Sequence, residues 1–492
     1  MTNNNLNSFR DVIIVGAGIS GINTAHHIQT NLPNFNYSLL ESRSNIGGTW
    51  DLFRYPGIRS DTDLHTFGFP WNPWHENRAI ADGGSIANYL CQSARDAGID
   101  QHILFRYRVV SANWCTEVGL WELDIDIEDN RRVQLQCRFL VLGTGYYDYT
   151  EGLEPDIAGL STNFKGTVAH PQFWPESLDY TDKRVVIIGS GATAITLLPN
   201  IATKAAHVTM VQRSPTYIMS IDNQTGSSLR HKVLPQSWAF KIDRWIFMWA
   251  IVVIYQACRL FPGWSRKTLQ SAVAKQLPDH VPIDPHFVPR YKPWDQRLCF
   301  SPNGDFFESL RAGKAHLETG CIKSVAAGSV IMESGKDLDA DIIVPATGLK
   351  LAIGGRIDVK VDGIQVDLAD RYAWRTALLQ DVPNLAFMMG YVNASWTLGT
   401  ETTSQLLCRL LLYMERNRYT TVVPRVPVGS HLQPEPMWNL DATYVKKAAG
   451  QMPRCGNIGP WKGRTNYFVD LWKAKYGSIT EDVEFDTAGS KA

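Results

Sequence analysis

The chain has 492 residues, and its 48 lysines and arginines balance 48 aspartates and glutamates. The length predicts about three domains, and the zero net charge argues against electrostatic capture of nucleic acid. The eight cysteines are scattered and form no C-x-x-C pair, which predicts a reduced intracellular protein without structural zinc or a redox disulfide. The polar N-terminus predicts no signal peptide, so the expected location is cytoplasmic.

The first informative element is a glycine-rich turn after an apolar run, with Gly16, Gly18 and Gly21. The first glycine allows the tight turn, the second lets the backbone approach a pyrophosphate, and the third lets the helix pack on the strand. Glu41 ends the next apolar run, 20 residues after Gly21, where a carboxylate binds ribose hydroxyls. This pattern predicts a site for FAD or NAD.

Three runs of alternating polar and apolar residues follow, at 103–114, 120–128 and 132–142. Their period of two predicts an antiparallel meander inserted into a parallel sheet. The last run leads into the turn Thr144–Gly145, which closes this unit near residue 150.

A second fingerprint has Gly189, Gly191 and Ala194, and its next strand ends in Arg213 and Ser214. A guanidinium at the place that Glu41 takes in the first unit binds a 2′-phosphate, which a carboxylate would repel. This site is therefore predicted to bind NADPH. Two nucleotides in one chain imply hydride transfer from one to the other.

Residues 223–295 change to a helical, aromatic and then proline-rich pattern, which predicts a helical insertion in the second unit. Within it, Trp245 to Cys258 carries no charge over fourteen residues. That is shorter than the roughly 20 residues that cross a bilayer. Two interpretations stay open: a buried helix, or an interfacial helix that makes a peripheral membrane contact through residues 245–258.

The C-terminal part, from about residue 384, begins with a buried strand and an apolar helix that should return to the first unit. The predicted fold is α/β, with two tandem Rossmann-like dinucleotide-binding domains and a helical insertion in the second. The FAD domain is assigned to residues 1–150 and 384–492. The NADP domain is assigned to residues 151–222 and 296–383, interrupted by the insertion at 223–295. A polar, mobile tail is expected from about Thr480.

Two long strings are more specific than the fingerprints. FKGTVAHPQFWP, from Phe164 to Pro175, and GGTWDLFRYPGIRSD, from Gly47 to Asp61, match signatures of type I Baeyer–Villiger monooxygenases. The chain resembles this family over nearly its whole length. The strings QRSPTYI and KPWDQRLC are similar to its ethionamide-activating branch.

The resemblance implies FAD, NADPH and O2 as reactants and a small ketone, aliphatic in type, as substrate. The product would be an ester or lactone, formed through a flavin C4a-peroxide, and members of this branch can also oxygenate sulfur. By the same resemblance, Arg297 is the catalytic arginine and Asp61 is its partner carboxylate. A fixed guanidinium suits this role because it keeps its charge beside a developing oxyanion.

His170 lies in the linker between the two nucleotide units, beside Pro171. The resemblance gives this histidine a role in linker conformation and not in the chemical step. Trp50 is expected near the flavin ring, with a core position as the alternative. Asn393, Ser395 and Trp396 precede the C-terminal helix, whose first N–H groups could point at the flavin pyrimidine ring.

Most of the residues expected to bind the two cofactors lie in or next to the strings above. They are Gly16, Gly18, Ser20, Gly21, Glu41, Gly48, Thr49, Trp50, Asp51, Leu52, Arg59, Ser60, Asp61, Val109, Gly189, Ser190, Gly191, Ala192, Thr193, Ala194, Arg213 and Ser214.

Three other protein classes share part of this pattern. A disulfide reductase shares the two fingerprints but needs a redox cysteine pair, which the sequence lacks. A flavin monooxygenase that oxygenates only sulfur or nitrogen is the closest alternative. A non-enzymatic NADP sensor would bind NADP without FAD. The histidines have no metal-ligand spacing, no metal site is expected, and the oligomeric state stays open.

Overall fold

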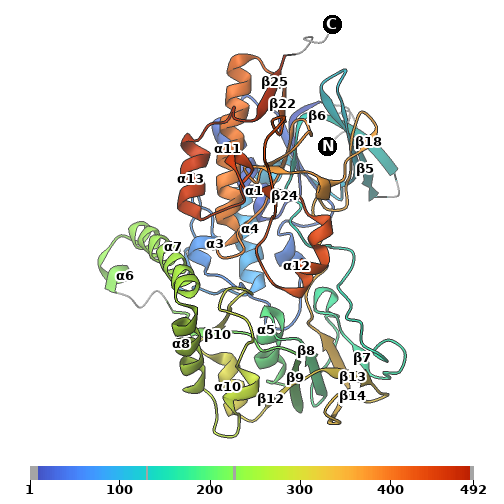
Figure 1. The fold of residues 1–492 in the computed structure, drawn as a ribbon, viewed down its shortest axis with the longest axis vertical. Helices are drawn as coiled ribbons and strands as arrows, with labels where there is room; N and C mark the ends of the chain where they lie inside the picture. Colours follow the sequence, from blue (N-terminus) through green and yellow to red (C-terminus); the bar gives the residue numbers. More distant parts are fainter. Residues whose placement is uncertain (1–8, 129–130, 225–228, 488–492) are drawn as a thin grey trace.

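The computed structural model describes residues 9–128, 131–224 and 229–487, and Figure 1 shows two α/β units stacked along its long axis. The upper unit contains the first fingerprint and the C-terminal helices. The lower unit contains the second fingerprint. The helical insertion protrudes from one side between them. The α/β fold class with two tandem nucleotide-binding units is confirmed.

The first unit is built on an 11-stranded sheet whose main path runs β18-β17-β4-β5-β6-β1-β2-β3. Strands β1, β2, β3 and the end of β6 are parallel, whereas β4, β5 and β6 form an antiparallel meander. The elements of its N-terminal part are β1 (Arg10–Val15), α1 (Ile19–Asn31), β2 (Tyr37–Glu41), α2 (Thr49–Leu52), α3 (Leu64–Phe67), α4 (Gly83–Asp96), β3 (Ile103–Phe105), β4 (Arg108–Cys115), β5 (Leu120–Ile127) and β6 (Arg131–Leu142).

The C-terminal segment completes this first unit. Strand β21 pairs in parallel with β6, and helix α11 packs on α1, which confirms the predicted return of the chain. The elements are β17 (Asp358–Val361), β18 (Ile364–Gln365), β19 (Ala373–Trp374), β20 (Leu378–Leu379), β21 (Leu385–Phe387), α11 (Trp396–Asn417), β22 (Thr421–Pro424), β23 (Pro434–Pro436), α12 (Thr443–Ala448), β24 (Arg454–Gly456), α13 (Tyr467–Tyr476) and β25 (Val483–Asp486).

Two separate apolar clusters cover the faces of the first sheet. One contains Ile22 of α1 and Leu410 of α11, and the other contains the fully buried Trp114 and Trp121 of the meander. Burial on both faces fixes the register of the parallel strands, because a one-residue slip would turn apolar side chains to the wrong face. The strand ends that border the functional site are held in place in this way.

The second unit has a five-stranded parallel sheet in the order β12-β9-β8-β16-β7, with a small antiparallel sheet β13-β14-β15 beside it. Its elements are β7 (Thr167–Val168), β8 (Arg184–Ile188), α5 (Ala192–Ile201), β9 (His207–Gln212), β10 (Ile218–Ile221), β11 (Cys299–Pro302), α10 (Asp305–Arg311), β12 (Ala315–Thr319), β13 (Ile322–Val325), β14 (Ser329–Met332), β15 (Asp337–Asp339) and β16 (Ile342–Pro345).

The insertion leaves the second unit after β10 and returns at β11, and these two strands pair in parallel. It contains α6 (Leu229–Val233), α7 (Gln236–Leu260), α8 (Pro262–Ala274) and α9 (Ile283–His286). In the described residues no single helix is long and apolar enough to cross a membrane. Helices α7 and α8 meet that criterion only as a pair bent by 116°.

The interpretation of residues 245–258 as a buried helix is wrong for one face of α7. Trp245 and Trp249 are 54% and 53% exposed, and Val253 is 60% exposed. The opposite face is buried through Met248 and Cys258. An uncharged run does not show which neighbours it will have, so the sequence alone could not decide this point.

Three boundaries also differ from the sequence prediction. Strands β17 to β20 belong to the first sheet, because β17 pairs with β4, so the chain leaves the second unit well before residue 384. The run at 103–114 is two strands, since β3 pairs in parallel with β2 before the meander starts at β4. Residues Val483–Asp486, expected to be a mobile tail, form β25 and pair with β22. Each difference reflects a long-range pairing that local composition does not encode.

Candidate active site

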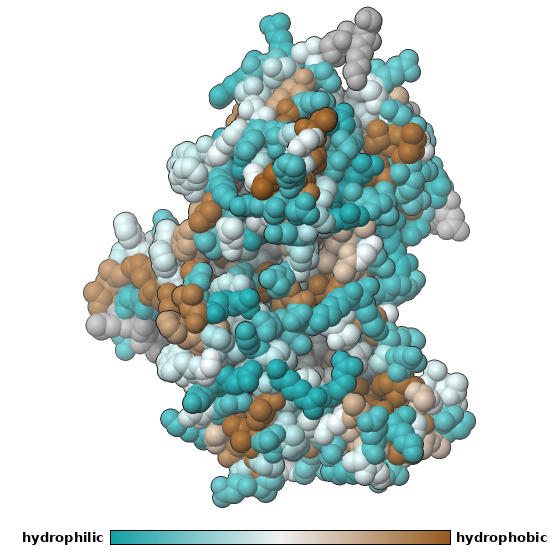
Figure 2. Space-filling model, viewed as in Figure 1, coloured by the Kyte–Doolittle hydropathy of each residue, from teal (hydrophilic) through white to brown (hydrophobic). Residues whose placement is uncertain are grey.

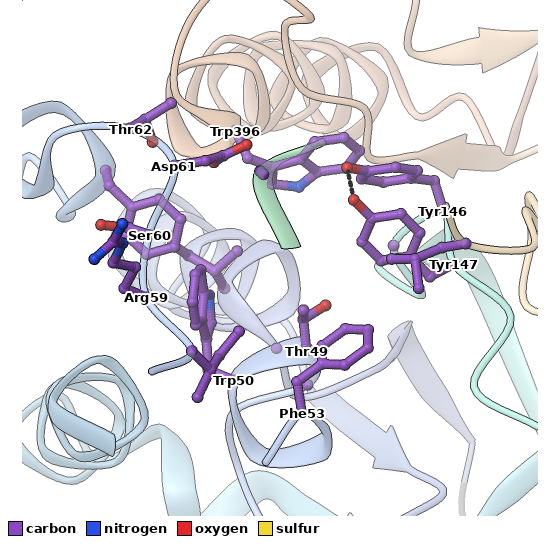
Figure 3. Close-up of a pocket in the computed structure, with 18 of the residues that line it drawn as sticks. Thr49, Trp50, Phe53, Arg59, Ser60, Asp61, Thr62, Tyr146, Tyr147 and Trp396 are labelled. Carbon is purple, nitrogen blue, oxygen red and sulfur yellow. Dashed lines mark hydrogen bonds between the residues drawn. The ribbon is translucent and has the colours of Figure 1, made fainter. Parts of the chain in front are cut away.

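One large cavity lies between the two units, with about 1370 Å³ of empty space including its open mouth. Residues of both units line it, among them Trp50 of the first unit and Thr193 of the second. Figure 3 shows Arg59, Ser60 and Asp61 on one side of it and Tyr146 and Tyr147 on the other. Of the predicted site residues, the cavity brings together Gly18, Ser20, Gly48, Thr49, Trp50, Arg59, Ser60, Asp61, Ala192, Thr193, Arg297 and Trp396.

Bare backbone forms one end of the cavity. A Cβ on Gly48 would lie 3.2 Å from the Cα of Gly18, and Gly48 has a φ of 56°, which favours glycine. Gly16 has a φ of 104°, and a Cβ there would lie 2.7 Å from the carbonyl oxygen of Gly143. The turn before α1 therefore leaves a smooth cradle at a helix N-terminus, which fits the pyrophosphate of FAD.

Glu41 lies at the end of β2, as predicted, and its carboxylate is 4% exposed. Oε2 accepts a hydrogen bond from the Ala17 amide at 2.8 Å, and Oε1 accepts one from the Arg43 amide at 2.9 Å. The carboxylate thus ties the glycine-rich turn to the end of β2. Each oxygen has further lone pairs that could accept ribose hydroxyls.

The second fingerprint has the same construction. Gly189 has a φ of 137°, and a Cβ there would lie 2.2 Å from the carbonyl oxygen of Ala346. Ser190 Oγ donates to the carbonyl oxygen of Ser214 at 2.8 Å, which joins the turn to the end of β9. Arg213 is exposed beside this turn, where a 2′-phosphate could reach it.

Arg297 and Asp61 form an ion pair in the cavity. Nη1 of Arg297 donates to Oδ2 of Asp61 at 2.6 Å, and both residues line the cavity. Burial opposes the charge of Arg297, but the Asp61 carboxylate beside it outweighs this effect and holds its pKa well above the ordinary value. This guanidinium is a permanent cation fixed between the two nucleotide units.

The Y-P-G turn before Asp61 packs against the second unit. Gly57 has a φ of 75°, and a Cβ there would lie 2.0 Å from the Asn200 amide of α5. Arg59 forms an ion pair with Asp305 at the start of α10. The segment that carries Asp61 belongs to the first unit and is therefore also fixed by contacts with the second unit. Arg59 takes part in these contacts and also lines the cavity.

Sequence reasoning missed the tyrosines of this site. Tyr146, Tyr147 and Tyr149 follow the end of β6 and line the cavity. The hydroxyls of Tyr146 and Tyr147 are hydrogen-bonded to each other, and the Thr49 hydroxyl lies 3.1 Å from the Tyr149 hydroxyl. Burial raises the pKa of Tyr147 well above its ordinary value and that of Tyr149 to about 12, so both stay neutral. The sequence signal that could have identified these tyrosines as site residues is their position directly after Gly145, at the carboxyl end of a strand.

The start of α11 borders the cavity, as expected. Trp396 stacks on Tyr146 with ring centroids 4.6 Å apart, and its indole N–H donates to Ser20 Oγ at 2.9 Å. Ser395 is buried as the N-cap residue, and its hydroxyl lies 2.6 Å from that of Thr66. The role of Asn393, Ser395 and Trp396 near the flavin remains a prediction.

Several predicted cofactor residues lie outside the cavity lining. Asp51 is buried in ion pairs with Arg43 and Arg54, at 2.6 and 3.1 Å. Val109 packs in the core of the meander. Leu52 ends α2 and is likewise outside the lining. Their contacts with FAD remain predictions.

His170 lies outside the lining as well and begins a short turn. Its Nδ1 accepts a hydrogen bond from the Gln172 amide at 3.2 Å, and burial lowers its pKa. A Cβ on Gly152 would lie 2.7 Å from its ring, so the imidazole fills space against the linker backbone. This placement agrees with a role in the conformation of the linker.

The residues described contain no group of three His, Cys, Asp or Glu placed to hold a metal ion.

Comparison with known proteins places the chain in a family. A model for flavin-binding monooxygenase-like proteins matches residues 9–236. The FAD-containing monooxygenase EthA of Mycolicibacterium smegmatis is 43% identical over 474 residues, covering 96% of both chains. The probable FAD-binding monooxygenase AlmA of Acinetobacter baylyi is 43% identical over 488 residues, covering 98% of both.

A crystal structure of oxidized steroid monooxygenase bound to NADP has the same fold. It superposes with a TM-score of 0.74 at 20% identity, covering 98% of this chain and 100% of that one. The similarity to these relatives agrees with the fold, in which a cavity lies between two nucleotide-binding units. The chain therefore belongs to the flavin-binding monooxygenase family and is a flavoprotein enzyme.

Proposed function

We propose that the enzyme is a Baeyer–Villiger monooxygenase that uses NADPH and O2 to convert small aliphatic ketones into esters or lactones. The balanced reaction consumes one ketone, one O2, one NADPH and one proton, and yields one ester, one water and one NADP⁺. The observation that carries this proposal is the Arg297–Asp61 ion pair inside the cavity shared by the two units.

The two cofactors are assigned to the two fingerprints. The backbone cradle at Gly18 and Gly48 and the Glu41 carboxylate would hold FAD. The turn at Gly189 and the exposed Arg213 would hold NADPH. FAD, when bound and reduced, supplies the activation of O2.

The residues of this chain contribute charge and position. Attack on a ketone carbonyl places negative charge on its oxygen, and Arg297 can donate hydrogen bonds to that oxygen from a fixed position. Asp61 orients the guanidinium through a charge-assisted hydrogen bond. Neutral Tyr146 and Tyr147, with Trp396, form a largely apolar wall that excludes water from the reacting groups.

Oxygenation of sulfur or nitrogen is the alternative, and its chemistry differs at one point. A sulfide or amine attacks the transferred oxygen directly and forms no tetrahedral oxyanion. A strong requirement for Arg297 in product formation would therefore favour the ketone reaction. The relatives' names specify a monooxygenase without naming its substrate.

The test is a panel of ketones and sulfides of matched size, incubated with the purified holoenzyme, NADPH and ¹⁸O2. Products are identified by mass, and NADPH consumption and hydrogen peroxide are measured in parallel. An ester or lactone carrying one ¹⁸O atom supports the proposal. Sulfoxides as the sole products, with every ketone unchanged, would contradict it and favour the alternative.

A further inference from the structure

The outer face of the insertion exposes a row of large apolar side chains that the proposed chemistry does not use. Figure 2 shows a patch of hydrophobic residues on the side of the molecule where α7 lies in Figure 1. We call this patch the α7–α8 surface. Its residues are Val233, Leu234, Trp238, Trp245, Ile246, Trp249, Val253, Leu260, Phe261 and Trp264.

The spacing of these residues places them along one side of α7. Trp238, Trp245, Trp249 and Val253 follow one another at intervals of four or seven residues, which aligns them on a helix. Phe468 of α13 stacks on Trp245 and Trp249 with ring centroids 5.8 and 4.7 Å apart, yet both tryptophans stay about half exposed. Single exposed apolar residues are ordinary, but a continuous row usually marks an interaction site.

A buried ion-pair cluster fixes the orientation of this face. Asp243, on the inner side of α7, is fully buried and forms ion pairs with Arg230 and His231. Arg244 donates to the backbone carbonyl oxygens of His65 and Gly68 in the first unit, at 2.7 and 2.8 Å. The helix therefore cannot rotate to bury its tryptophans without breaking these contacts.

Positive charge accompanies the apolar row. The segment 229–275 contains one acidic residue, the buried Asp243. It also contains eight basic ones: Arg230, Lys232, Lys241, Arg244, Arg259, Arg266, Lys267 and Lys275. Lys241 lies on the same face between Trp238 and Trp245, and Lys232 and Lys267 are exposed near the two ends of the row. The whole chain has no net charge, so this concentration is local.

We propose that the α7–α8 surface docks the enzyme onto an anionic lipid bilayer, with α7 lying in the interface. Tryptophans partition into the headgroup region, and lysines at its edge attract anionic lipids. Helices α7 and α8 are bent by 116°. This bend favours shallow insertion of the corner formed by Leu260, Phe261 and Trp264, and it disfavours a helix that spans the bilayer. A second copy of this chain is a less suitable partner for the α7–α8 surface, because two such faces would bring like charges together.

The inner side of α7 gives this surface a further use, which rests on the proposed function. A small pocket there is lined by Met248, Ile251, Val252 and Tyr255, and Ala394 lies in both its wall and that of the main cavity. We infer that an apolar ketone dissolved in the bilayer enters beside α7, toward the wall at Ala394 that this pocket shares with the main cavity. The substrates favoured by this arrangement are lipophilic ones that concentrate in membranes.

The binding test uses the FAD-loaded full chain and vesicle flotation, with no substrate present, so its outcome is independent of the proposed function. Neutral phosphatidylcholine vesicles are compared with vesicles containing phosphatidylglycerol. We expect flotation with the anionic vesicles, weakened by high salt. A Trp245→Ser, Trp249→Ser variant should lower the partition coefficient by at least about tenfold, because each buried side chain of this size contributes that much or more. The matched control is Ile364→Ser, Val428→Ser, which removes exposed apolar residues elsewhere.

Charge reversal supplies the second arm. Lys232→Glu, Lys241→Glu, Lys267→Glu should abolish the preference for anionic vesicles while turnover of a water-soluble ketone stays unchanged. Failure of the unaltered enzyme to float with either vesicle type would overturn the proposal. So would sedimentation analysis showing, without lipid, a dimer that the tryptophan variant dissociates, since the face would then be an interface between copies.

Discussion

Arg297 donates a 2.6 Å hydrogen bond to Asp61, although 236 positions separate the two residues in the chain. Asp61 follows the Y-P-G turn of the first unit, and Arg297 precedes β11, where the chain returns from the insertion. The pair therefore joins a segment of the first unit to a segment at the end of the insertion. Its position places one fixed cation in the cavity that both units line.

Replacing Arg297 should separate NADPH consumption from oxygenation. We expect Arg297→Ala to retain bound FAD and to lose about 10²–10³-fold in ester formation, since it removes a donor to a developing oxyanion. The NADPH that is still consumed should yield hydrogen peroxide. Arg297→Lys should restore little, because an ammonium lacks the planar fork that holds both carboxylate and oxyanion. Ester formation by Arg297→Ala at the unaltered rate would mean that another group stabilises the charge.

Asp61→Ala should act in the same direction but less completely, because Asp61 works by orienting the guanidinium. We expect a partial fall in the ratio of ester formed to NADPH consumed. That ratio is measured by product analysis against absorbance at 340 nm in each variant. A larger loss than in Arg297→Ala would show that Asp61 has a separate role.

Arg213 should determine the choice of nicotinamide cofactor. Arg213→Ala removes a charge-assisted phosphate contact of roughly 1.5–3 kcal/mol, so the KM for NADPH should rise while that for NADH stays nearly constant. Steady-state kinetics with both cofactors measure this. Lys204→Ala, an exposed cation of the same unit, serves as the control. Equal losses with NADPH and NADH would show that Arg213 does not contact the 2′-phosphate.

His170→Ala should slow turnover without uncoupling it. The imidazole fills space against Gly152 and caps the turn at Gln172, so its loss should raise the KM for NADPH or slow flavin reduction through linker motion. The ratio of ester to NADPH should stay at its unaltered value, and so should the pH dependence of oxygenation. If one titration disappears from that pH profile, His170 is an acid–base catalyst.

His26 should make the fold sensitive to mild acid. Burial against Trp71, helped by neighbouring His27, lowers its pKa from 6.5 to about 4. Between those values the unfolded chain binds a proton that the folded chain does not, so stability falls as pH decreases from about 6.5 to about 4. Thermal melting of His26→Phe should show a smaller fall over that range, whereas the exposed-histidine control His280→Phe should behave as the unaltered enzyme does. An unchanged pH profile in His26→Phe would assign the sensitivity to other groups.

The sequence was sufficient for the parts whose physics is local. A strand, a glycine turn and a helix N-terminus together make a phosphate cradle wherever they occur, so Gly16, Gly18 and Gly189 could be placed without a structure. The period of two in the meander likewise predicted its strands. The resemblance in the two long strings added Arg297 and Asp61, which no periodicity reveals.

Only the tertiary structure decided which distant segments meet. It paired β17 with β4, and it brought Tyr146, Tyr147 and Trp396 to one wall of the cavity. It also left the tryptophans of α7 facing outward. An apolar residue contributes the same transfer free energy whether a helix, a strand or a membrane covers it, because the hydrophobic effect has no direction. The sequence therefore shows which apolar surfaces are stabilised by burial, and the packing of the whole chain determines which of them are buried.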